Sequence, residues 1–257
     1  MAETKEPLKT IILLPRSSFK FACEPGISCY TSCCANVNIF LTPYDVLRLR
    51  KRLRLSSEEF LHVFTTKLAG TNPVIPLVLL KMGEEPPRRC PFVTDTGCTV
   101  YEDRPWACRM FPLDMEIKGK YSIMASQDRC KGLLRSEEQN VADWLEKQGV
   151  HEYDLMNELY EQFTGDDRIN RLDVINPQIK SMVFMATYDL DTFRRFVFES
   201  KFLKLFDLEE ERIERIKEDE LELLLLGLDW IKFGLFGEKT IQVKKDDTSS
   251  RQASATE

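Results

Sequence analysis

The hydrophobic positions of this chain follow helical spacing in one early stretch and again throughout the second half. In the early stretch, Val46, Leu49 and Leu53 share one face of a helix that opens with the sequence Thr-Pro-Tyr-Asp. Thr42 is a suitable N-cap there, proline suits the first turn, and Asp45 complements the helix dipole. We therefore predict a helix from Thr42 to Leu53.

A second helix is predicted immediately after the first, because Ser56 and Glu59 have the spacing of a capping box. Residues 71–80 form an apolar run that indicates an extended stretch. Residues 99–101 and 121–124 are the best short strands. This part of the chain is therefore expected to contain short helices and a small irregular sheet.

The second half of the chain predicts successive helices that begin at polar capping residues. The expected caps are Ser136 with Gln139, Asn176 before a proline, and Asp191. Helices are accordingly expected at residues 139–148, 151–163, 176–190 and 192–200.

The longest apolar region, residues 221–236, is interrupted by charges at Glu222, Asp229 and Lys232. A bilayer span needs about 20 nearly uninterrupted apolar residues, so this region predicts a buried or partner-facing helix instead. The acidic run at residues 209–222 is expected to be a solvated helix face.

Together these patterns predict an α+β fold that is mainly helical. An irregular, cysteine-rich N-terminal half with short strands is expected to pack against a helical C-terminal half. The predicted parts are a flexible lead-in at residues 1–18, a cysteine-cluster region at 19–135, a helical region at 136–238 and a disordered tail at 239–257.

The composition is that of an ordinary globular protein, since 43% of the 257 residues are hydrophobic and 30% are charged. The 36 Lys and Arg residues against 42 Asp and Glu residues give a formal net charge of -6. A general nucleic-acid binder needs positive charge to displace counterions, so we expect no nucleic-acid partner. The two histidines, His62 and His151, are too few for a histidine-based metal site.

The beginning of the chain has no recognisable export signal, because its apolar run at residues 11–14 is much shorter than a signal-peptide core. No segment has the composition of a membrane span. We therefore expect a cytoplasmic protein without a membrane partner.

Cysteine has the most uneven distribution in the chain. All eight cysteines lie in the first 130 residues, and the last 127 residues contain none. Burial as small hydrophobic residues would account for one or two of them, and a reducing cytoplasm disfavours disulfides. Thiolate ligation of a metal or an iron–sulfur centre is the favoured interpretation, with redox-active thiols as an alternative. The candidate ligands are Cys23, Cys29, Cys33, Cys34, Cys90, Cys98, Cys108 and Cys130.

The spacing of these cysteines does not identify the metal. Cys33 and Cys34 are adjacent, so the two thiolates could serve different metals, or one could bind while the other packs. Eight thiolates would serve two four-ligand sites, or one cluster with spare cysteines. No C-x2-C pair occurs, unlike in common zinc fingers and bacterial ferredoxins.

Basic residues flank the last cysteines of the series. Nearby guanidinium groups lower the pKa values of thiols and offset the negative charge of a thiolate-bound metal. We therefore expect these cations to lower the pKa values of the neighbouring thiols. They are Arg88 and Arg89 before Cys90, Arg104 and Arg109 around Cys108, and Arg129 and Lys131 around Cys130.

Three sequence blocks carry a resemblance to a known family. They are FACEPGISCYTSCC at residues 21–34, LTPYDVLRLRKRL at 41–53, and CPFVTDTGCTVYEDRPWACRMFPL at 90–113. Together they resemble the YkgJ family of cysteine-cluster proteins over roughly residues 19–135. The resemblance implies a zinc- or iron-chelating domain whose ligands are the cysteines of these blocks, with Cys130 as the further cysteine.

The opening cysteine motif differs from the form that is common in that family. It reads C-x5-C-x3-C-C, where the family often has C-x2-C-x2-C-C. The wider spacing is similar to the opening of flagellin lysine N-methylases, which share the domain.

Three functions follow as hypotheses. The first is a metal-binding protein whose iron–sulfur cluster or Zn2+ organises the fold and serves electron transfer or a protein partner of the helical C-terminal half. Loop-borne cysteines without paired knuckles favour iron–sulfur over zinc. The second, from the resemblance alone, is a methyltransferase-like enzyme that modifies protein lysines, and the third is a redox sensor using Cys33 and Cys34. No catalytic motif is recognisable, so the sequence assigns no enzyme activity.

Overall fold

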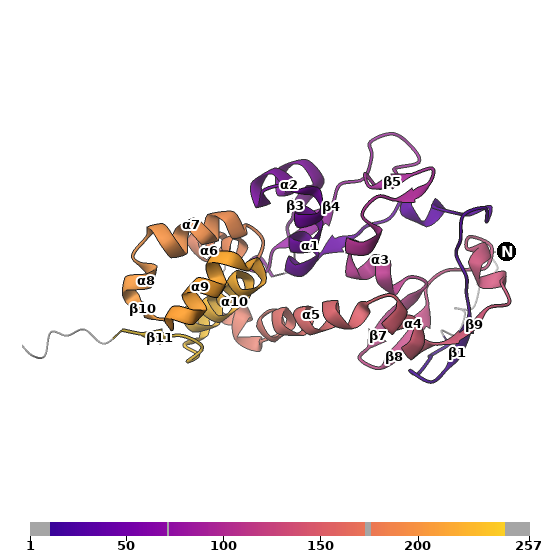
Figure 1. Ribbon diagram of the computed structural model, residues 1–257. Coiled ribbons are helices and arrows are strands. Elements are labelled where there is room, and N and C mark those ends of the chain that lie inside the picture. Colours follow the sequence, from indigo (N-terminus) through magenta and orange to yellow (C-terminus); the bar gives the residue numbers. More distant parts are fainter. Residues whose placement is uncertain (1–10, 71, 173–175, 245–257) are drawn as a thin grey trace, which may run out of the picture. The chain divides into compact units, whose positions relative to one another are not determined.

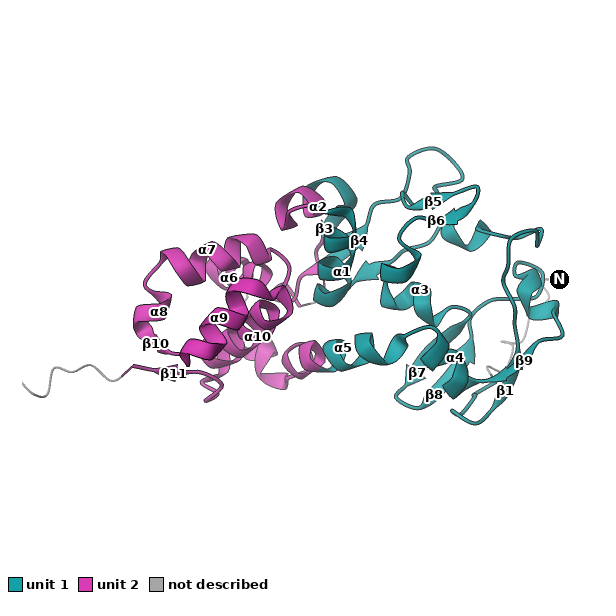
Figure 2. Cartoon of the chain, viewed as in Figure 1, with its two compact units in different colours: residues 1–54, 62–67, 78–158 teal, residues 55–61, 68–77, 159–257 magenta. Residues whose placement is uncertain are grey.

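The structure is a computed structural model that describes residues 11–70, 72–172 and 176–244. Short strands predominate in the first part of the chain and helices in the second (Figure 1). The chain is therefore an α+β protein that is mainly helical, as the sequence predicted. It divides into two compact units (Figure 2), of which unit 1 comprises residues 1–54, 62–67 and 78–158, and unit 2 comprises residues 55–61, 68–77 and 159–257.

Small antiparallel sheets form the strand content of unit 1. The strands are β1 Ser18–Lys20, β2 Phe40–Leu41, β3 Thr65–Leu68, β4 Leu77–Leu80, β5 Val93–Thr94, β6 Gly97–Cys98, β7 Leu113–Ile117, β8 Lys120–Ile123 and β9 Glu138–Asn140. Strand β1 pairs with β9, β5 with β6, and β7 with β8, while β2, β4 and β3 form a three-stranded sheet in that order.

Short helices alternate with these strands. They are α1 Pro43–Leu53, α2 Ser57–Phe64, α3 Trp106–Met110, α4 Val141–Lys147 and α5 Val150–Thr164, with the 3-10 helices η1 Ser32–Cys34, η2 Tyr101–Asp103 and η3 Lys131–Leu134. The boundary between the units falls inside both α2 and α5.

One hydrophobic cluster joins parts of unit 1 that are far apart in the sequence. Its buried side chains come from the N-terminal segment, α3, β7, β8, η3 and α4, and include Leu13, Phe19, Phe21, Met110, Leu113, Cys130, Val141 and Leu145. The rings of Phe19 and Phe21 meet the ring of Trp144 edge-on, with centroids 6.1 and 5.2 Å apart. Helix α4 therefore packs with the cysteine-bearing segments, although the sequence suggested a division near residue 135.

A buried guanidinium fixes α3 within unit 1. Arg109 is 6% exposed and donates hydrogen bonds to the carbonyl oxygens of Glu102, Arg104 and Gln148 and to the hydroxyl of Tyr153. Its guanidinium carbon lies 4.3 Å from the centroid of the Tyr153 ring. One side chain thus ties together the turn before α3, the end of α4 and the start of α5.

A buried carboxylate makes a second connection to α3. Asp45 is 1% exposed and accepts hydrogen bonds from the backbone N–H groups of Thr42 and Trp106, at 2.9 and 2.8 Å. Burial raises the pKa of Asp45 to about 6, although these hydrogen bonds act in the opposite direction. Ionisation of Asp45 therefore costs the folded state stability as the pH rises from about 4 to about 6. The benefit is geometric, because α1 is fixed to the first residue of α3.

Unit 2 is built from helices that surround α10. The elements are η4 Asp167–Arg171, α6 Pro177–Thr187, α7 Leu190–Glu199, α8 Phe202–Leu205, β10 Phe206–Asp207, α9 Glu210–Glu218, α10 Glu220–Phe236 and β11 Gln242–Val243. Helix α10 buries Leu223, Leu224, Leu226 and Leu228, which confirms the predicted buried helix. None of the described helices is both long and apolar enough to cross a membrane.

Helices α6 and α10 approach each other most closely at a glycine. A Cβ atom on Gly227 would lie 2.2 Å from the backbone oxygen of Ala186, far inside van der Waals contact. Gly234, two turns further along the same helix, has open space, since its Cβ would first meet the terminal methyl carbon of Met182 at 3.9 Å. Only the first glycine is therefore needed for packing.

Most predicted helices are confirmed, with their caps. The side chain of Thr42 accepts from the backbone of Asp45 in a capping box, Ser56 and Glu59 form the second box, and Asn176 caps α6. Helix α5 spans residues 150–164, close to the predicted 151–163. These caps could be found because each depends on residues within one turn.

Several local predictions are wrong. The cap of α4 is Asn140 rather than Ser136 or Gln139, because residues 138–140 pair with β1 as strand β9. Asp189 caps α7, whereas Asp191 accepts hydrogen bonds from the backbone and hydroxyl of Ser57. The strand predicted at residues 99–101 is instead a turn and the start of η2.

Parts of the predicted flexible lead-in and disordered tail have defined structure at the two ends of the described chain. The backbone of Leu13 exchanges hydrogen bonds with Tyr121, and its side chain is buried. Residues 242–243 form β11 beside β10, and Ile241 is buried. The remainder of the predicted lead-in and tail, residues 1–10 and 245–257, lies outside the described residues.

Replacing Arg109 by lysine is expected to lower the free energy of unfolding of unit 1 by about 3 kcal/mol, because an ammonium cannot reach all of the buried acceptors. Arg52→Lys makes the same chemical change on the exposed side of α1 and should alter stability by less than about 0.5 kcal/mol. Urea denaturation of both variants measures the difference. Equal midpoints for the two variants would show that the Arg109 bonds do not hold α3.

The two glycines of α10 give opposite expectations. Gly227→Ala should destabilise the protein by about 1–3 kcal/mol, because α6 and α10 must move apart. Gly234→Ala should stabilise it by up to ~1 kcal/mol, since alanine favours the helix and fills open space. Thermal denaturation of the pair checks this, and a stable Gly227→Ala variant would contradict the close approach.

Candidate metal centre

All eight cysteines belong to unit 1, and none forms a disulfide. Cys33 and Cys34 lie in η1, Cys98 in β6 and Cys108 in α3, while Cys23, Cys29, Cys90 and Cys130 lie in connecting loops. Cys130 is buried, whereas Cys23, Cys33 and Cys108 are exposed. The thiols are therefore carried by short elements and turns.

One group of thiols gathers where the first cysteine loop meets η3. The backbone N–H of Lys131 donates to the Sγ atom of Cys29 at 3.2 Å. A backbone hydrogen bond of 3.2 Å from Ala22 to Gly132 joins the same two segments. Desolvation raises the pKa of Cys23 to about 11, with smaller contributions from the charges of Cys33, Cys29 and Cys130. These four thiols are thus within electrostatic reach of one another.

The other cysteines gather around the β5–β6 hairpin. The backbone N–H of Cys90 donates to the carbonyl oxygen of Cys34 at 2.7 Å, and Val93 stands opposite Cys98 in the hairpin. Desolvation raises the pKa of Cys108 to about 12, although part of this residue is exposed, and the charges of Cys90 and Cys98 add to the effect. Cys34, Cys90, Cys98 and Cys108 therefore form a second neighbourhood.

The adjacent pair connects the two neighbourhoods. The neighbouring Cys34 side chain and burial together raise the pKa of Cys33 well above its usual range. The backbone on either side is in the left-handed region, with φ of 62° at Thr31 and 55° at Asn36. A β-branched residue such as threonine rarely adopts this conformation, so the loop stores strain beside the cysteine pair.

The expected effect of neighbouring cations on the thiol pKa values is present at two cysteines but does not set the net direction. Arg104 does act in that direction on Cys98 and Cys108, but desolvation outweighs it at both. The pKa values of Cys90 and Cys130 are raised for the same reason. Neutral thiols are poor nucleophiles in disulfide exchange, so this environment gives no support to a thiol redox sensor.

The donor chemistry of the two neighbourhoods fits a metal. Zinc and iron–sulfur clusters are both bound by four cysteine thiolates, and each neighbourhood has four cysteines. Arg104 is a cation beside the second group that could offset thiolate charge, and the backbone N–H of Lys131 donates to a sulfur of the first group. Within the described residues, no three side chains of the ligating types are arranged closely enough to hold a metal ion. The fit therefore concerns donor type and number.

The two histidines have exposed side chains, His62 on α2 and His151 on α5.

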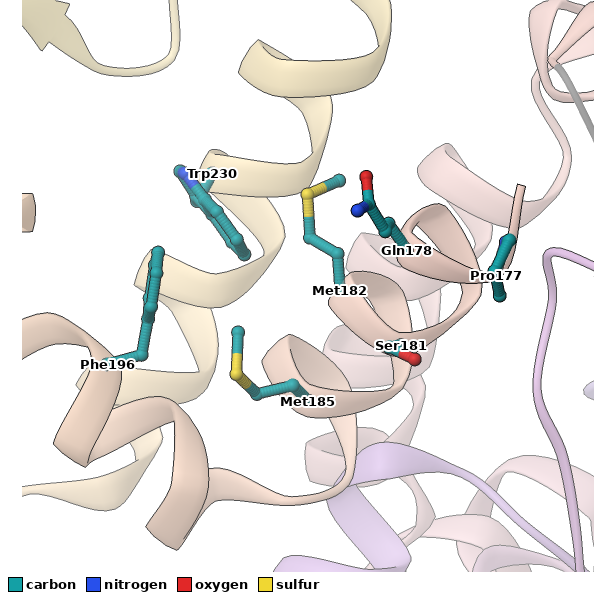
Figure 3. Close-up of a pocket in the computed structure, with 7 residues that line it drawn as sticks. All are labelled: Pro177, Gln178, Ser181, Met182, Met185, Phe196 and Trp230. Atoms are coloured by element: carbon teal, nitrogen blue, oxygen red, sulfur yellow. The ribbon is translucent and has the colours of Figure 1, made fainter.

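A separate hollow lies in unit 2 between α6, α7 and α10 (Figure 3). It has a volume of about 500 Å3 and is lined by Pro177, Gln178, Ser181, Met182, Met185, Phe196 and Trp230. None of these seven side chains is ionisable. The only common metal ligands among them are the two methionine sulfurs, which favour soft metals such as Cu(I). The hollow therefore offers no acid, base or thiol for catalysis, and the predicted protein partner of this half stays a prediction.

Comparison with known proteins gives one match. Residues 22–131 match the family model CxxCxxCC, which is described as "Putative zinc- or iron-chelating domain". No curated protein and no solved structure matches the chain, so the resemblance to flagellin lysine N-methylases has no support from these comparisons. The matched range contains all eight cysteines and joins the first cysteine loop to Cys130. Residues 22–131 of this chain are therefore similar to a domain described as zinc- or iron-chelating.

Proposed function

We propose that this protein binds zinc or an iron–sulfur centre through the cysteine thiolates of unit 1, and that the bound metal organises the loops that carry them. The observation behind the proposal is that these loops bury almost no side chains. Ile27 is the one buried residue in the stretch 22–36, and residues 81–91 contain none. Hydrophobic burial therefore contributes little to the stability of the cysteine loops.

Metal binding would supply what these loops lack. Structural zinc provides roughly 10–16 kcal/mol of apparent binding free energy in small zinc domains, and this energy becomes folding energy when the site exists only in the folded state. Thiols with raised pKa values release their protons when a cation takes their place. The strained backbone around Cys33 and Cys34 would be held by the same bonds.

An iron–sulfur centre is the finer assignment that we propose. Its support is the loop placement of the cysteines and the lack of the C-x2-C knuckles found in common structural zinc sites. The partial exposure of Cys90 and Cys98 would leave such a centre close enough to the surface for electron transfer. A reducing compartment such as the cytoplasm would keep the thiols free for the metal.

Purification without oxygen tests the metal assignment directly. We expect iron and acid-labile sulfide together with a brown colour, because sulfide-to-iron charge transfer absorbs visible light. Zinc without iron would retain the binding function and correct the metal. Folded protein that contains neither metal, and that takes up neither when they are added, would contradict the proposal.

Removal of thiolates should loosen the cysteine loops and leave unit 2 intact. In the double variant Cys33→Ser with Cys34→Ser, we expect metal content to fall at least severalfold and amide hydrogen exchange in residues 22–36 and 81–100 to accelerate. Exchange in α6 and α10 should not change, because unit 2 has no cysteine.

Ser32→Ala is the matched control for that experiment. It alters an exposed side chain in the same turn without removing a thiol. Its metal content and its hydrogen exchange should equal those of the unaltered protein. If the control and the double variant behave alike, the loop is held by contacts other than metal bonds.

A further inference from the structure

We infer that unit 1 contains two separate four-thiolate sites, and that the adjacent pair gives one thiolate to each. The first site consists of Cys23, Cys29, Cys33 and Cys130, and the second consists of Cys34, Cys90, Cys98 and Cys108. The inference rests on the proposed metal-binding function and adds the number of sites and the ligands of each.

The first site is defined by the contact between the loop of residues 22–34 and η3. The bond from the backbone of Lys131 to the sulfur of Cys29 places the residue after Cys130 against this thiol. The bond between Ala22 and Gly132 holds the residue before Cys23 beside the same turn. Backbone N–H donation to a ligating sulfur is also the usual way in which a protein stabilises thiolate charge.

The second site is defined by backbone pairing around the β5–β6 hairpin. Ala35 forms a bridge with Arg89, and the carbonyl oxygen of Cys34 accepts from the N–H of Cys90. The N–H of Val93 donates to the carbonyl oxygen of Cys90 at 3.2 Å, which closes the turn that leads to Cys98. The fourth member, Cys108, is held on α3 by the buried network of Arg109.

Apart from the interaction between the adjacent Cys33 and Cys34, the electrostatic contacts divide the thiols along the same line. Cys130 is coupled to Cys29 and Cys33, whereas Cys108 is coupled to Cys90 and Cys98. Within the first group, Cys23 has all three of the other members as neighbours.

The conformation of the adjacent pair explains why it divides. Cys33 and Cys34 lie in a 3-10 helix, where successive side chains point about 120° apart. Two neighbouring side chains with that separation reach two different metal centres more easily than they reach a single shared centre. Two thiolates on adjacent residues also repel each other, which favours a separate centre for each.

Charge also favours two separate centres over one. Zinc with four thiolates carries a formal charge of -2, and each group has a different donor or cation nearby to offset it. Arg104 lies within electrostatic reach of Cys98 and Cys108 of the second group, while the backbone N–H of Lys131 donates to the sulfur of Cys29 in the first. Arg104 keeps its position through hydrogen bonds to Tyr101 and Gln148.

Thiol protection in the unaltered full-length chain tests the partition. The reduced, metal-free protein is titrated with Zn2+ without oxygen, alkylated with iodoacetamide and measured by intact mass spectrometry. We expect two Zn2+ per chain and molecules that carry eight, four or no alkyl groups. Fragmentation of the molecules with four groups should find the labels on one complete set of four and protection on the other, with Cys33 and Cys34 always divided.

Two single variants provide the second measurement. Cys23→Ser and Cys108→Ser each remove an exposed thiol, one from each group. Each variant should bind one Zn2+ per chain at concentrations that saturate two in the unaltered protein, and the double variant should bind none. In each single variant, the cysteines of the intact group should stay protected.

Each other outcome overturns a different statement. One Zn2+ per chain, labels that mix the two groups, or a single variant that loses both ions would overturn the partition and leave metal binding in place. No zinc protection of any thiol, together with no iron in the anaerobically purified protein, would overturn the proposed function itself.

Discussion

The proposed function makes the cysteine loops of unit 1 depend on an attraction that the protein chain does not supply alone, because residues 22–36 and 81–91, which carry Cys23, Cys29, Cys33, Cys34 and Cys90, have hardly any hydrophobic burial. Beneath them, the side chains of Phe19, Phe21 and Leu113 form a conventional core with α4. Backbone hydrogen bonds bring the loops together, and desolvation raises the pKa values of Cys23 and Cys108. A thiophilic cation changes both the protonation of the thiols and the attraction between the loops, since it replaces the protons and joins the loops by metal–sulfur bonds. Folding of the loops and metal binding are then one equilibrium.

The buried polar residues of unit 1 have a positional role. A buried ion such as the guanidinium of Arg109 contributes little net stability, since the loss of hydration offsets much of its hydrogen bonding. What it provides is a fixed location for α3, through three carbonyl oxygens that belong to different segments. The carboxylate of Asp45 adds a bond to Trp106 at the other end of the helix. Cys108 lies between Trp106 and Arg109, the two residues through which α3 is fixed, so its position is set by the protein before any metal binds.

The sequence was sufficient wherever the determining residues are close together along the chain. Two helices could be predicted because both partners of each capping box lie within one turn, Thr42 with Asp45 and Ser56 with Glu59. The caps of α4 and α7 could not be found in this way. Residues 138–140 pair with a distant strand, and Asp191 accepts a hydrogen bond from the distant hydroxyl of Ser57. The cysteine cluster was visible from its density in the first 130 residues. Spacing rules cannot tell which distant loop approaches Cys33 and which approaches Cys34. That choice depends on contacts between residues about 55 to 100 positions apart in the sequence.

The two units also differ in the kind of change that each can tolerate. Unit 2 derives its stability from interlocking helices, and its critical point is steric, at the contact of Gly227 with Ala186. A core of this kind depends on shape and is independent of redox conditions and metal supply. In the proposed function, the cysteine loops of unit 1 depend on thiol chemistry, so oxidation or loss of metal would remove their main source of order. Because the last cysteine is at position 130, unit 2 keeps its stability under both conditions. Changes in metal or redox state are therefore confined by the fold to the cysteine-bearing segments, which is the arrangement expected when the metal has a role beyond holding the whole chain together.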